Sequence, residues 1–305
     1  MTQFKESLAI EKLPSVQGRY SFGHLMSQTT WFKVGGAADL LFRPADTVDL
    51  CHFLKNKPSN LAITCIGAGS NLLVRDGGIE GCVVKLGSGF SDISIENDLV
   101  IAGAGCLDRT VAMKCQEAGL SGLEFLVGIP GTIGGALAMN AGAYENETKD
   151  FLEWFEFVDQ QGVLHRLHTN EIHMTYRHGN LPAGAIAVRA AFRCIKKDPN
   201  EIRIKVSDYL HKREESQPIR GRTGGSTFKN PSQGSKAWEL IDLAGCRGLR
   251  IGDAQVSEKH CNFLLNLDAA RANDIEALGT MVQKKVKEIT GQELEWEIIR
   301  IGSRL

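Results

Sequence analysis

The sequence lacks an excess of charge of either sign. Its 305 residues contain 35 lysines and arginines against 36 aspartates and glutamates, which gives a net charge of −1. This balance argues against a broad basic surface for nucleic acid, so any anion must be recognised locally and the ligand is expected to be small. With 43% hydrophobic and 23% charged residues, the composition is typical of a globular protein, and the length suggests two or three domains.

Long apolar runs and paired cysteines are missing too. No stretch approaches the roughly 18 apolar residues of a transmembrane helix, and the first twenty residues carry charges instead of an apolar signal-peptide core. The eight cysteines form no CxxC pair and no cluster at zinc spacing, so we expect no metal site. Most of them stand in apolar runs such as "AITCIG", which is typical of reduced core thiols and of a cytoplasmic protein without a membrane partner.

The usual nucleotide-binding motifs are also absent, although two glycine-rich turns are present. Neither "IGAGSNLLVRDGG" at 66–78 nor "GIPGTIGGALAMNAGA" at 128–143 is a Rossmann fingerprint or a Walker loop. Glycine lets backbone amides approach an anion, so we expect the two turns to hold opposite sides of one pyrophosphate. A flavin fits this pattern better than a nicotinamide held in the usual way. Turn capping remains the alternative role for Ser70, Asn71 and Asn140.

Apolar runs alternate with helical patterns, which indicates mixed α and β structure. Strands are expected in "ADLLFRPAD", "LAITCIG", "DLVIAGAG" and "AGAIAVRAAFRCI". Helices are expected after Asp46, in "LDRTVAMKCQEAG" ending at Gly119, and in "EIRIKVSDYLHKREESQP" ending before Pro218. The clearest helical period predicts one buried face made by Ile275, Leu278, Val282, Val286 and Ile289.

Three polar residues of the second half are candidates for chemistry. They are Arg177 in "TYRHG", Ser226 in "GGSTFKNP" and Glu297 in "LEWEIIRIG". The residues alone favour plainer roles: a turn for Ser226, and a surface or packing role for Arg177. Glu297 would share one face of a strand with Glu293 and Glu295, so that face could be exposed to water.

Taken together in this order, "GAGSNLLVRDGG", "GIPGTIGGALAMNAGA", "YRHG", "GSTFKNP" and "VSEKHCNFLLN" resemble the UDP-N-acetylenolpyruvoylglucosamine reductase family. These flavoenzymes make UDP-N-acetylmuramate for peptidoglycan. The resemblance runs from "TTWFKVGGAADL" to "EIIRIG", nearly the whole chain. The number of residues between Arg177 and Ser226 is small. In this respect the chain resembles the shorter subclass of the family, which lacks an inserted tyrosine loop.

The resemblance implies an α+β fold with a two-lobed FAD-binding region, PCMH-like and not Rossmann, and a C-terminal α/β substrate-binding domain. The lobes would be residues 1–88 and 89–205. The substrate domain would be 206–305, with its C-terminal strand returning to the flavin site.

The resemblance also implies roles for residues. Ser226 would be the proton donor, with Arg177 and Glu297 beside the enolpyruvyl group. The substrate, a UDP-sugar, would contact Tyr176, Lys229 and Asn230, and NADPH would be the co-substrate. We expect the protein to be a monomer. Non-covalent FAD would be held by Gly67, Ala68, Gly69, Ser70, Asn71, Gly128, Pro130, Gly131, Gly134, Gly135, Asn140 and Gly142.

Two other functions stay open at this point. One is a flavoprotein oxidase or dehydrogenase that acts on an alcohol on a related FAD-binding fold. The other is a nucleotide-binding module without turnover.

Overall fold

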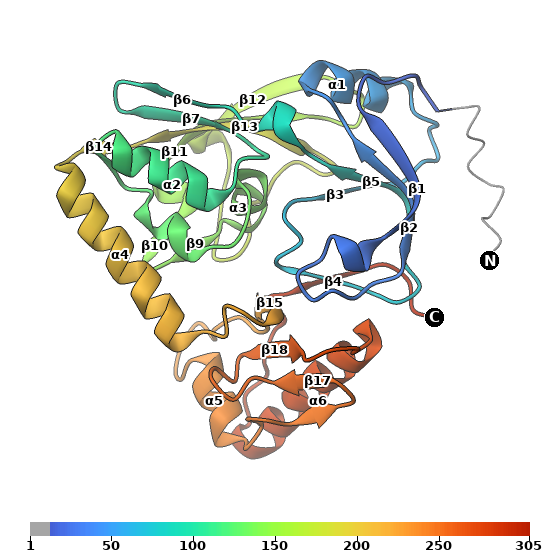
Figure 1. Ribbon diagram of the computed structural model, residues 1–305, viewed down its shortest axis with the longest axis vertical. Coiled ribbons are helices and arrows are strands. Elements are labelled where there is room, and N and C mark those ends of the chain that lie inside the picture. Colours follow the sequence, from blue (N-terminus) through green and yellow to red (C-terminus); the bar gives the residue numbers. More distant parts are fainter. Residues whose placement is uncertain (1–12) are drawn as a thin grey trace. The chain divides into compact units, whose positions relative to one another are not determined.

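The structure is a computed structural model that describes residues 13–305. Residues 1–12, which belong to the predicted first lobe and to the charged N-terminal stretch, lie outside the described part. The chain forms two compact units (Figure 1). The first contains the chain up to Phe22, Leu40–Ala68 and Gly81–Lys212, and the second contains Gly23–Asp39, Gly69–Glu80 and Arg213–Leu305. The division into domains 1–88, 89–205 and 206–305 stays a prediction.

The largest sheet of the first unit is antiparallel throughout. Its strand order is β12-β11-β13-β7-β6, with bounds Leu164–His168, Leu152–Val158, Ile186–Arg193, Leu99–Gly103 and Ile93–Glu96. The central strands form because "LEWFEFV" and "IAVRAAFR" are rich in the branched and aromatic residues that sheets favour. A Rossmann fold needs a parallel sheet, so the α+β prediction is confirmed in this respect.

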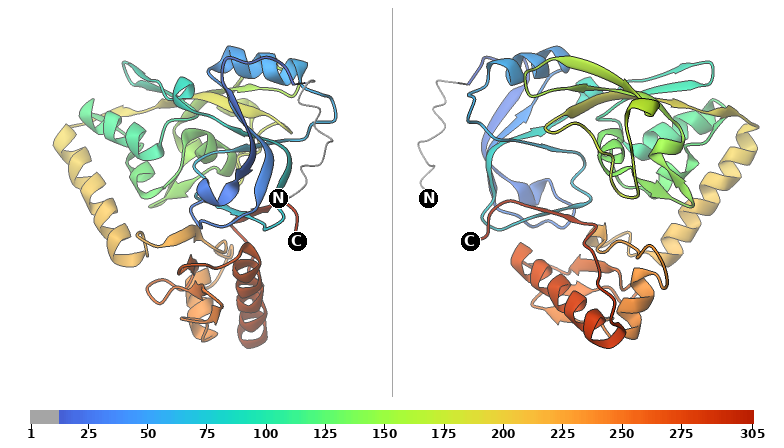
Figure 2. Two further views of the ribbon diagram at one scale, coloured as in Figure 1. Left: turned by 45° about the vertical axis from the view of Figure 1, so that its right-hand side comes forward. Right: turned by 180° about the vertical axis from the view of Figure 1, so that it is seen from behind.

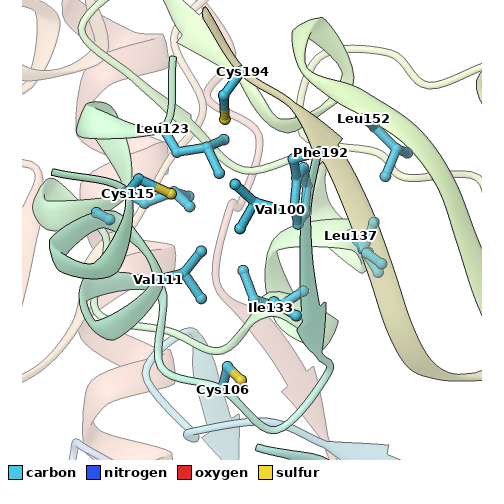
Figure 3. Close-up of a cluster of buried hydrophobic side chains, with 14 of the residues drawn as sticks. Val100, Cys106, Val111, Cys115, Leu123, Ile133, Leu137, Leu152, Phe192 and Cys194 are labelled. Atoms are coloured by element: carbon cyan, nitrogen blue, oxygen red, sulfur yellow. The ribbon is translucent and has the colours of Figure 1, made fainter. Parts of the chain in front are cut away.

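Two helices pack on this sheet and close the main core of the first unit. These are α2 (Asp108–Glu117) and α3 (Ile133–Met139). Figure 3 shows Val111 of α2 and Ile133 of α3 beside Val100 of β7 and Phe192 of β13, all buried. Helix α2 ends before Gly119, which has a left-handed φ of 68° as predicted. The last helix to begin in this unit is α4 (Pro199–Ser216), which ends before Pro218 as predicted.

A second core of the first unit lies under α1 (Thr47–Asn56). Asp46 accepts a hydrogen bond from the Asp49 amide at 2.8 Å, so it caps the helix as predicted. Leu50 and Phe53 of α1 pack with Phe42 and Val84. The sheet below has the order β1-β2-β5-β3, with bounds Arg19–Leu25, Ala37–Arg43, Ile79–Lys85 and Ile63–Ile66. Strands β1, β2 and β5 continue into the second unit.

The second unit is built on a four-stranded sheet of order β15-β18-β17-β16, with bounds Arg222–Ser226, Phe263–Asn266, Ala254–Val256 and Arg250–Ile251. Helix α6 (Ala272–Thr290) packs against β16, β17, β18 and α5 (Ala237–Leu243), as Figure 2 shows. A separate parallel pair joins β4 (Leu72–Val74) to β19 (Ile299–Ile301). This pair brings the first glycine turn next to the C-terminal segment.

Shorter elements connect these parts. Four of the two-residue strands form two antiparallel pairs, β8 (Leu120–Ser121) with β14 (Ile195–Lys196), and β9 (Gly142–Ala143) with β10 (Asn146–Glu147). Single turns of 3₁₀ helix lie at Met26–Gln28, Ser88–Phe90, Glu124–Gly128, Thr148–Asp150 and Thr169–Glu171.

Two side-chain predictions are wrong. In α6 the positions Ile275, Leu278, Val282 and Val286 are buried, but Ile289 is 57% exposed. Ile289 lies on the same helical face, and its exposure follows from its place in the last turn. Cys65 is exposed because successive side chains of β3 point to opposite sides and Ile66 takes the buried one.

Six of the eight cysteines are buried, Cys51 is half-buried, and all eight are free thiols. No helix within residues 13–305 has the length and apolar character needed to cross a bilayer. Within the same residues, no three His, Cys, Asp or Glu side chains come together as metal ligands.

Candidate functional site

The second glycine turn is held by the segment that precedes α2. The Ile133 amide donates to the Cys106 carbonyl at 3.0 Å, and the Gly134 amide donates to the Ala104 carbonyl at 2.9 Å. Thr132 caps α3, since its hydroxyl accepts from the Gly135 amide at 3.4 Å. The turn is therefore a rigid part of the first unit.

Gly67, at the start of the first glycine turn, lies against the second turn. A Cβ atom placed on Gly67 would come within 2.7 Å of Thr132 Oγ1, and Gly135 Cα lies 4.0 Å from the same point. The Lys85 ammonium donates to the Gly67 carbonyl at 2.9 Å. Burial lowers the pKa of Lys85, and Arg43 nearby lowers it further. Gly67, Thr132 and Lys85 thus lie together in the first unit, and their binding of the FAD pyrophosphate stays a prediction.

Most glycines of the second turn are required by the protein itself. A Cβ on Gly131 would lie 2.5 Å from Asp108 Oδ2, one on Gly142 would lie 2.6 Å from the Asn146 carbonyl, and one on Gly128 would lie 2.8 Å from the Tyr144 ring. These contacts leave no room for a side chain whether or not a ligand binds. The glycine pattern that suggested a cofactor site therefore has a packing cause at these three positions.

Gly135 is different. Its Cβ would meet only Thr132 Oγ1, at an ordinary contact distance of 3.6 Å. The protein leaves room for a side chain there, and a helical position favours alanine over glycine. Packing within the protein therefore does not require glycine at this position. The missing side chain leaves space in which a ligand can approach the backbone closely. Gly135 is thus the position of the turn that fits a bound cofactor best.

Asn140, predicted to bind the cofactor, is fully buried and adopts a left-handed φ of 42° at the end of α3. Its amide nitrogen donates to Glu147 Oε2 and to the Thr175 carbonyl, both at 3.0 Å. Its amide oxygen accepts from the Lys149 backbone at 3.0 Å. The side chain is occupied by protein partners and the residue is fully buried, so its contact with the cofactor stays a prediction.

Asn140 also anchors the turn that carries Arg177. Thr175 and His178 exchange two backbone hydrogen bonds of 2.9 and 3.0 Å, which places Tyr176 and Arg177 at the tip of a tight turn. Arg177 has a φ of 55°, a conformation that L residues rarely adopt. Its guanidinium lies 4.7 Å from the centroid of the half-exposed Tyr176 ring. Strain of this kind is concentrated at functional sites, which favours a functional role for Arg177.

Ser226 ends β15 in the second unit, at an irregularity of the sheet. Thr223 pairs with Leu265 and Ser226 with Phe263, so the strand bulges at Gly224 and Gly225. Gly225 has a φ of 79°, which requires glycine, and a Cβ on Gly224 would clash with the Phe32 ring. The glycines before Ser226 thus serve the bulge that presents it.

The segment after Ser226 lies beside the segment that carries Glu297. The Glu297 amide donates to the Thr227 carbonyl, and the Lys229 amide donates to the Glu295 carbonyl, both at 2.8 Å. The Lys229 ammonium also forms an ion pair of 2.5 Å with Glu295. Ser226, Lys229 and Glu297 are therefore neighbours, as their predicted roles require.

The sequence did not reveal that Asn230 bonds to the start of α5 or that Glu297 lies outside the last strand. The Asn230 side-chain oxygen accepts from the Ala237 amide at 3.0 Å, at the start of α5. Glu297 was predicted to lie in a strand, but β19 begins two residues later, because residues 295–297 bond to the segment after Ser226. Of the three glutamates expected on one face, Glu293 and Glu295 are exposed and Glu297 is half-buried.

Gly69, Ser70 and Asn71 of the first turn belong to the second unit. The Asn71 side chain donates to the Glu297 carbonyl at 3.2 Å, and the Asn71 carbonyl accepts from the Ile299 amide at 3.0 Å. The Gly69 carbonyl accepts from the Trp31 amide at 3.0 Å. Asn71, predicted to bind the cofactor, is thus bound to the chain segment of a predicted catalytic residue.

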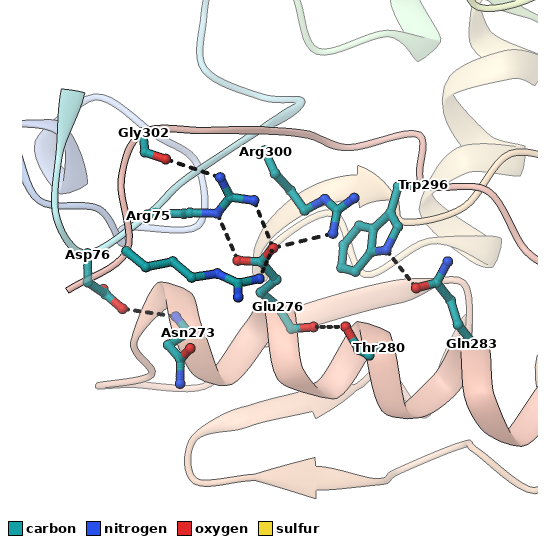
Figure 4. Close-up of polar contacts among 10 residues, drawn as sticks. Arg75, Asp76, Asn273, Glu276, Thr280, Gln283, Trp296, Arg300 and Gly302 are labelled. Atoms are coloured by element: carbon teal, nitrogen blue, oxygen red, sulfur yellow. Dashed lines mark hydrogen bonds and ion pairs between the residues drawn. The ribbon is translucent and has the colours of Figure 1, made fainter. Parts of the chain in front are cut away.

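A cluster of ion pairs around the buried Glu276 fixes this part of the second unit (Figure 4). Glu276 of α6 accepts two hydrogen bonds of 3.0 Å from Arg75, one of 3.3 Å from Arg300 and one of 3.2 Å from Arg304. The bonds from Arg75 lower the pKa of Glu276 to about 2, against the opposing effect of its burial. Asp76 accepts from the first two amides of α6 at 3.0 and 2.9 Å. Arg75 and Glu276 are 201 residues apart, so no local sequence pattern reveals their pairing.

Two known protein families match parts of this chain. Residues 38–168 match the family described as "FAD binding domain". Residues 217–301 match "UDP-N-acetylenolpyruvoylglucosamine reductase, C-terminal domain". The chain is thus a flavoprotein built from an FAD-binding domain and a reductase C-terminal domain, and the predicted fold class is confirmed.

Full-length relatives define the family. The UDP-N-acetylenolpyruvoylglucosamine reductase of Acidiphilium cryptum (strain JF-5) is 53% identical over 95% of this chain and 94% of its own length. That of Paramagnetospirillum magneticum (strain ATCC 700264 / AMB-1) is 51% identical over 100% and 99%. The crystal structure of the Thermus caldophilus enzyme has 33% identity and a TM-score of 0.82, and the match covers 94% of this chain and 100% of that one. The chain belongs to the UDP-N-acetylenolpyruvoylglucosamine reductase family.

Proposed function

We propose that this protein reduces the enolpyruvyl ether of UDP-N-acetylglucosamine to UDP-N-acetylmuramate, with FAD as its bound cofactor and NADPH as the reductant. The proposal rests on one observation above all: a single chain carries both the FAD-binding domain and the reductase C-terminal domain. Relatives of about half identity over nearly the whole length carry the same reductase name. The product is a precursor of peptidoglycan.

When bound at residues of the two glycine turns, such as Gly67 and Gly135, FAD would supply the hydride transfer between NADPH and the terminal carbon of the enol ether. The residues of the chain then have to handle the charge and the proton. As hydride arrives, negative charge develops on the adjacent carbon and spreads into the substrate carboxylate. Arg177 stabilises this charge, because a guanidinium is permanently cationic and grips a carboxylate at two points.

Ser226 donates its hydroxyl proton to the adjacent carbon, which completes the lactyl group. A hydroxyl can act as the acid here because the carbon it protonates is strongly basic. Glu297 polarises or orients the same substrate carboxylate. Tyr176, Lys229 and Asn230 contact the UDP-sugar, Asn230 near its diphosphate. We further propose a cytoplasmic monomer with no metal, nucleic-acid or membrane partner.

The visible spectrum and an anaerobic titration test this function. The purified protein should be yellow, and NADPH should bleach it in the absence of oxygen. The enolpyruvyl substrate should then restore the oxidised flavin spectrum without oxygen. A colourless protein would favour the nucleotide-binding module, and reoxidation by oxygen but not by the enolpyruvyl compound would favour an oxidase. A parallel titration with NADH decides which nicotinamide is used.

A further inference from the structure

The motif "VSEKHCNFLLN" at 256–266 has no role in the chemistry described so far. It forms the end of β17, a tight connection and β18. The Ser257 amide donates to the Phe263 carbonyl at 2.8 Å, and the Phe263 amide donates to the His260 carbonyl at 3.0 Å. The Ser257 hydroxyl accepts from the amides of Lys259 and His260. The connection is thus a rigid support for the residue at its end, Asn262.

Asn262 holds both backbone groups of Phe228 with a single side-chain amide. The amide oxygen accepts from the Phe228 N–H at 3.0 Å, and the amide nitrogen donates to the Phe228 carbonyl at 2.9 Å. The backbone carbonyl of Asn262 accepts from the Thr227 amide at 2.7 Å. Asn262 is 5% exposed, so water does not compete well for these bonds.

These bonds occur where the regular sheet stops. β15 ends at Ser226, and beyond it the Asn262 side chain takes the place of a neighbouring strand for Phe228. On its other side the same segment receives the Glu297 amide. The position of Ser226 relative to Glu297 therefore depends on how firmly residues 227 and 228 are held.

We propose that Asn262 is a positioning residue for the reaction: it holds the segment after Ser226 so that the serine hydroxyl stands where it can protonate the substrate carbon. This inference rests on the proposed function, since it assumes that Ser226 is the proton donor. A displacement of about 1 Å at a reacting group can cost about 100-fold in rate. The effect should fall on the step that uses Ser226 and spare the reduction of FAD by NADPH.

Asn262→Asp turns this geometry into a pH test. A protonated carboxyl group has the donor and acceptor pattern of the amide, whereas a carboxylate can only accept and would repel the Phe228 carbonyl. Burial raises the pKa of a carboxyl group, so its ionisation should fall in an accessible range. Charged or titratable groups near this position include His260, whose pKa is lowered by burial, and Cys261, whose pKa is raised by burial. Arg247 donates to the Cys261 sulfur at 3.8 Å and also lowers the pKa of His260. Lys229, Glu295 and Glu297 lie on the segments bonded to residues 227–229.

Stopped-flow measurement of substrate-driven flavin reoxidation, from about pH 5.5 to about pH 8.5, provides the readout. In Asn262→Asp this step should be about 10- to 100-fold slower than wild type at high pH and recover toward the wild-type rate at low pH. FAD reduction by NADPH should match wild type throughout. If reoxidation in this variant follows the wild-type pH profile, the proposal is overturned.

Asn266, at the end of β18, offers a matched control. It is also buried, and it also donates to a carbonyl, of Phe32 at 2.8 Å, and accepts from an amide, of Ala270 at 3.1 Å. Asn266→Asp should not introduce the new pH dependence into flavin reoxidation. If it does, the effect is a general result of a buried carboxylate and the proposal fails.

Two more variants complete the test. If Asn262→Asp does not fold, Asn262→Ser decides, because a hydroxyl replaces only part of the two-point contact. Slow, pH-independent flavin reoxidation in Asn262→Ser supports the proposal, and a wild-type rate refutes it.

Ser226→Ala in the same assay separates the proton-donor role of Ser226 from the positioning role of Asn262. If Ser226→Ala reoxidises normally, the proposed proton donor is wrong. If it is slow while both Asn262 variants are normal, only the positioning role is wrong.

Discussion

Gly135→Ala should have opposite effects on the stability of the apoprotein and on the affinity for FAD. The added methyl group meets only Thr132 Oγ1 at 3.6 Å, so the protein can accept it without strain. Alanine is favoured over glycine in a helix by up to about 1 kcal/mol. For a protein of this size such a gain raises the melting temperature of the apoprotein by about 2–4 °C.

The same methyl group occupies the space through which a phosphate would approach the backbone. Loss of one hydrogen bond to a charged group costs about 1.5–3 kcal/mol. That free energy corresponds to an FAD dissociation constant about 10- to 100-fold larger. Apoprotein prepared by acid release of the flavin can be titrated with FAD while flavin fluorescence is followed, and its melting can be measured separately.

Gly134→Ala is the matched control for this experiment. Its methyl group would lie 3.1 Å from the Ala104 carbonyl, which is a tight contact, so the apoprotein should become less stable. Wild-type FAD affinity in Gly135→Ala would refute the cofactor cradle at this turn. A loss of apoprotein stability in Gly135→Ala would show that the packing argument is wrong.

Two further predictions concern the buried cluster and the arginine turn. Because the folded-state pKa of Glu276 is about 2, below its usual 4.5, its ionisation contributes up to about 3 kcal/mol of stability above pH 4.5, which is lost as the pH falls through 2. Urea unfolding across this range should show the loss in wild type and less of it in Glu276→Gln, and parallel curves would contradict the assignment. Arg177→Met should lower turnover about 10²- to 10³-fold with little change in melting temperature. Arg166→Met, which removes another arginine packed on an aromatic ring, should leave turnover unchanged, and equal losses in both variants would return Arg177 to a packing role.

Local chemistry explains which parts of the fold could be predicted. The caps at Asp46 and Gly119 and the apolar run of β13 act over a few residues, and the structure has all three as predicted. The predicted burial of Ile289 and Cys65 was wrong, because burial at the end of a helix or on one face of a strand depends on which other elements pack there. Periodicity identifies a face, but it does not show where the covering element ends.

In the candidate site, too, local sequence patterns do not predict contacts between distant residues. The contacts of Asn71 with Glu297 and of Arg75 with Glu276 join residues 226 and 201 positions apart, so no local pattern reveals them. The glycines of the second turn were predicted as a cofactor cradle, yet Gly128, Gly131 and Gly142 are required by neighbouring protein atoms. Only the structure separates these from Gly135, because the sequence shows a missing side chain but not the reason for it.

The most direct test of the proposed chemistry is the rate of the two half-reactions in Ser226→Ala, measured by stopped flow. Reduction of FAD by NADPH should stay close to the wild-type rate, since hydride delivery to the flavin needs no acid at this position. Reoxidation by the enolpyruvyl substrate should fall by about 10²- to 10⁴-fold, as expected when a general acid is lost. If both half-reactions slow equally, or if neither slows, Ser226 is a turn residue and the proposed proton transfer is wrong.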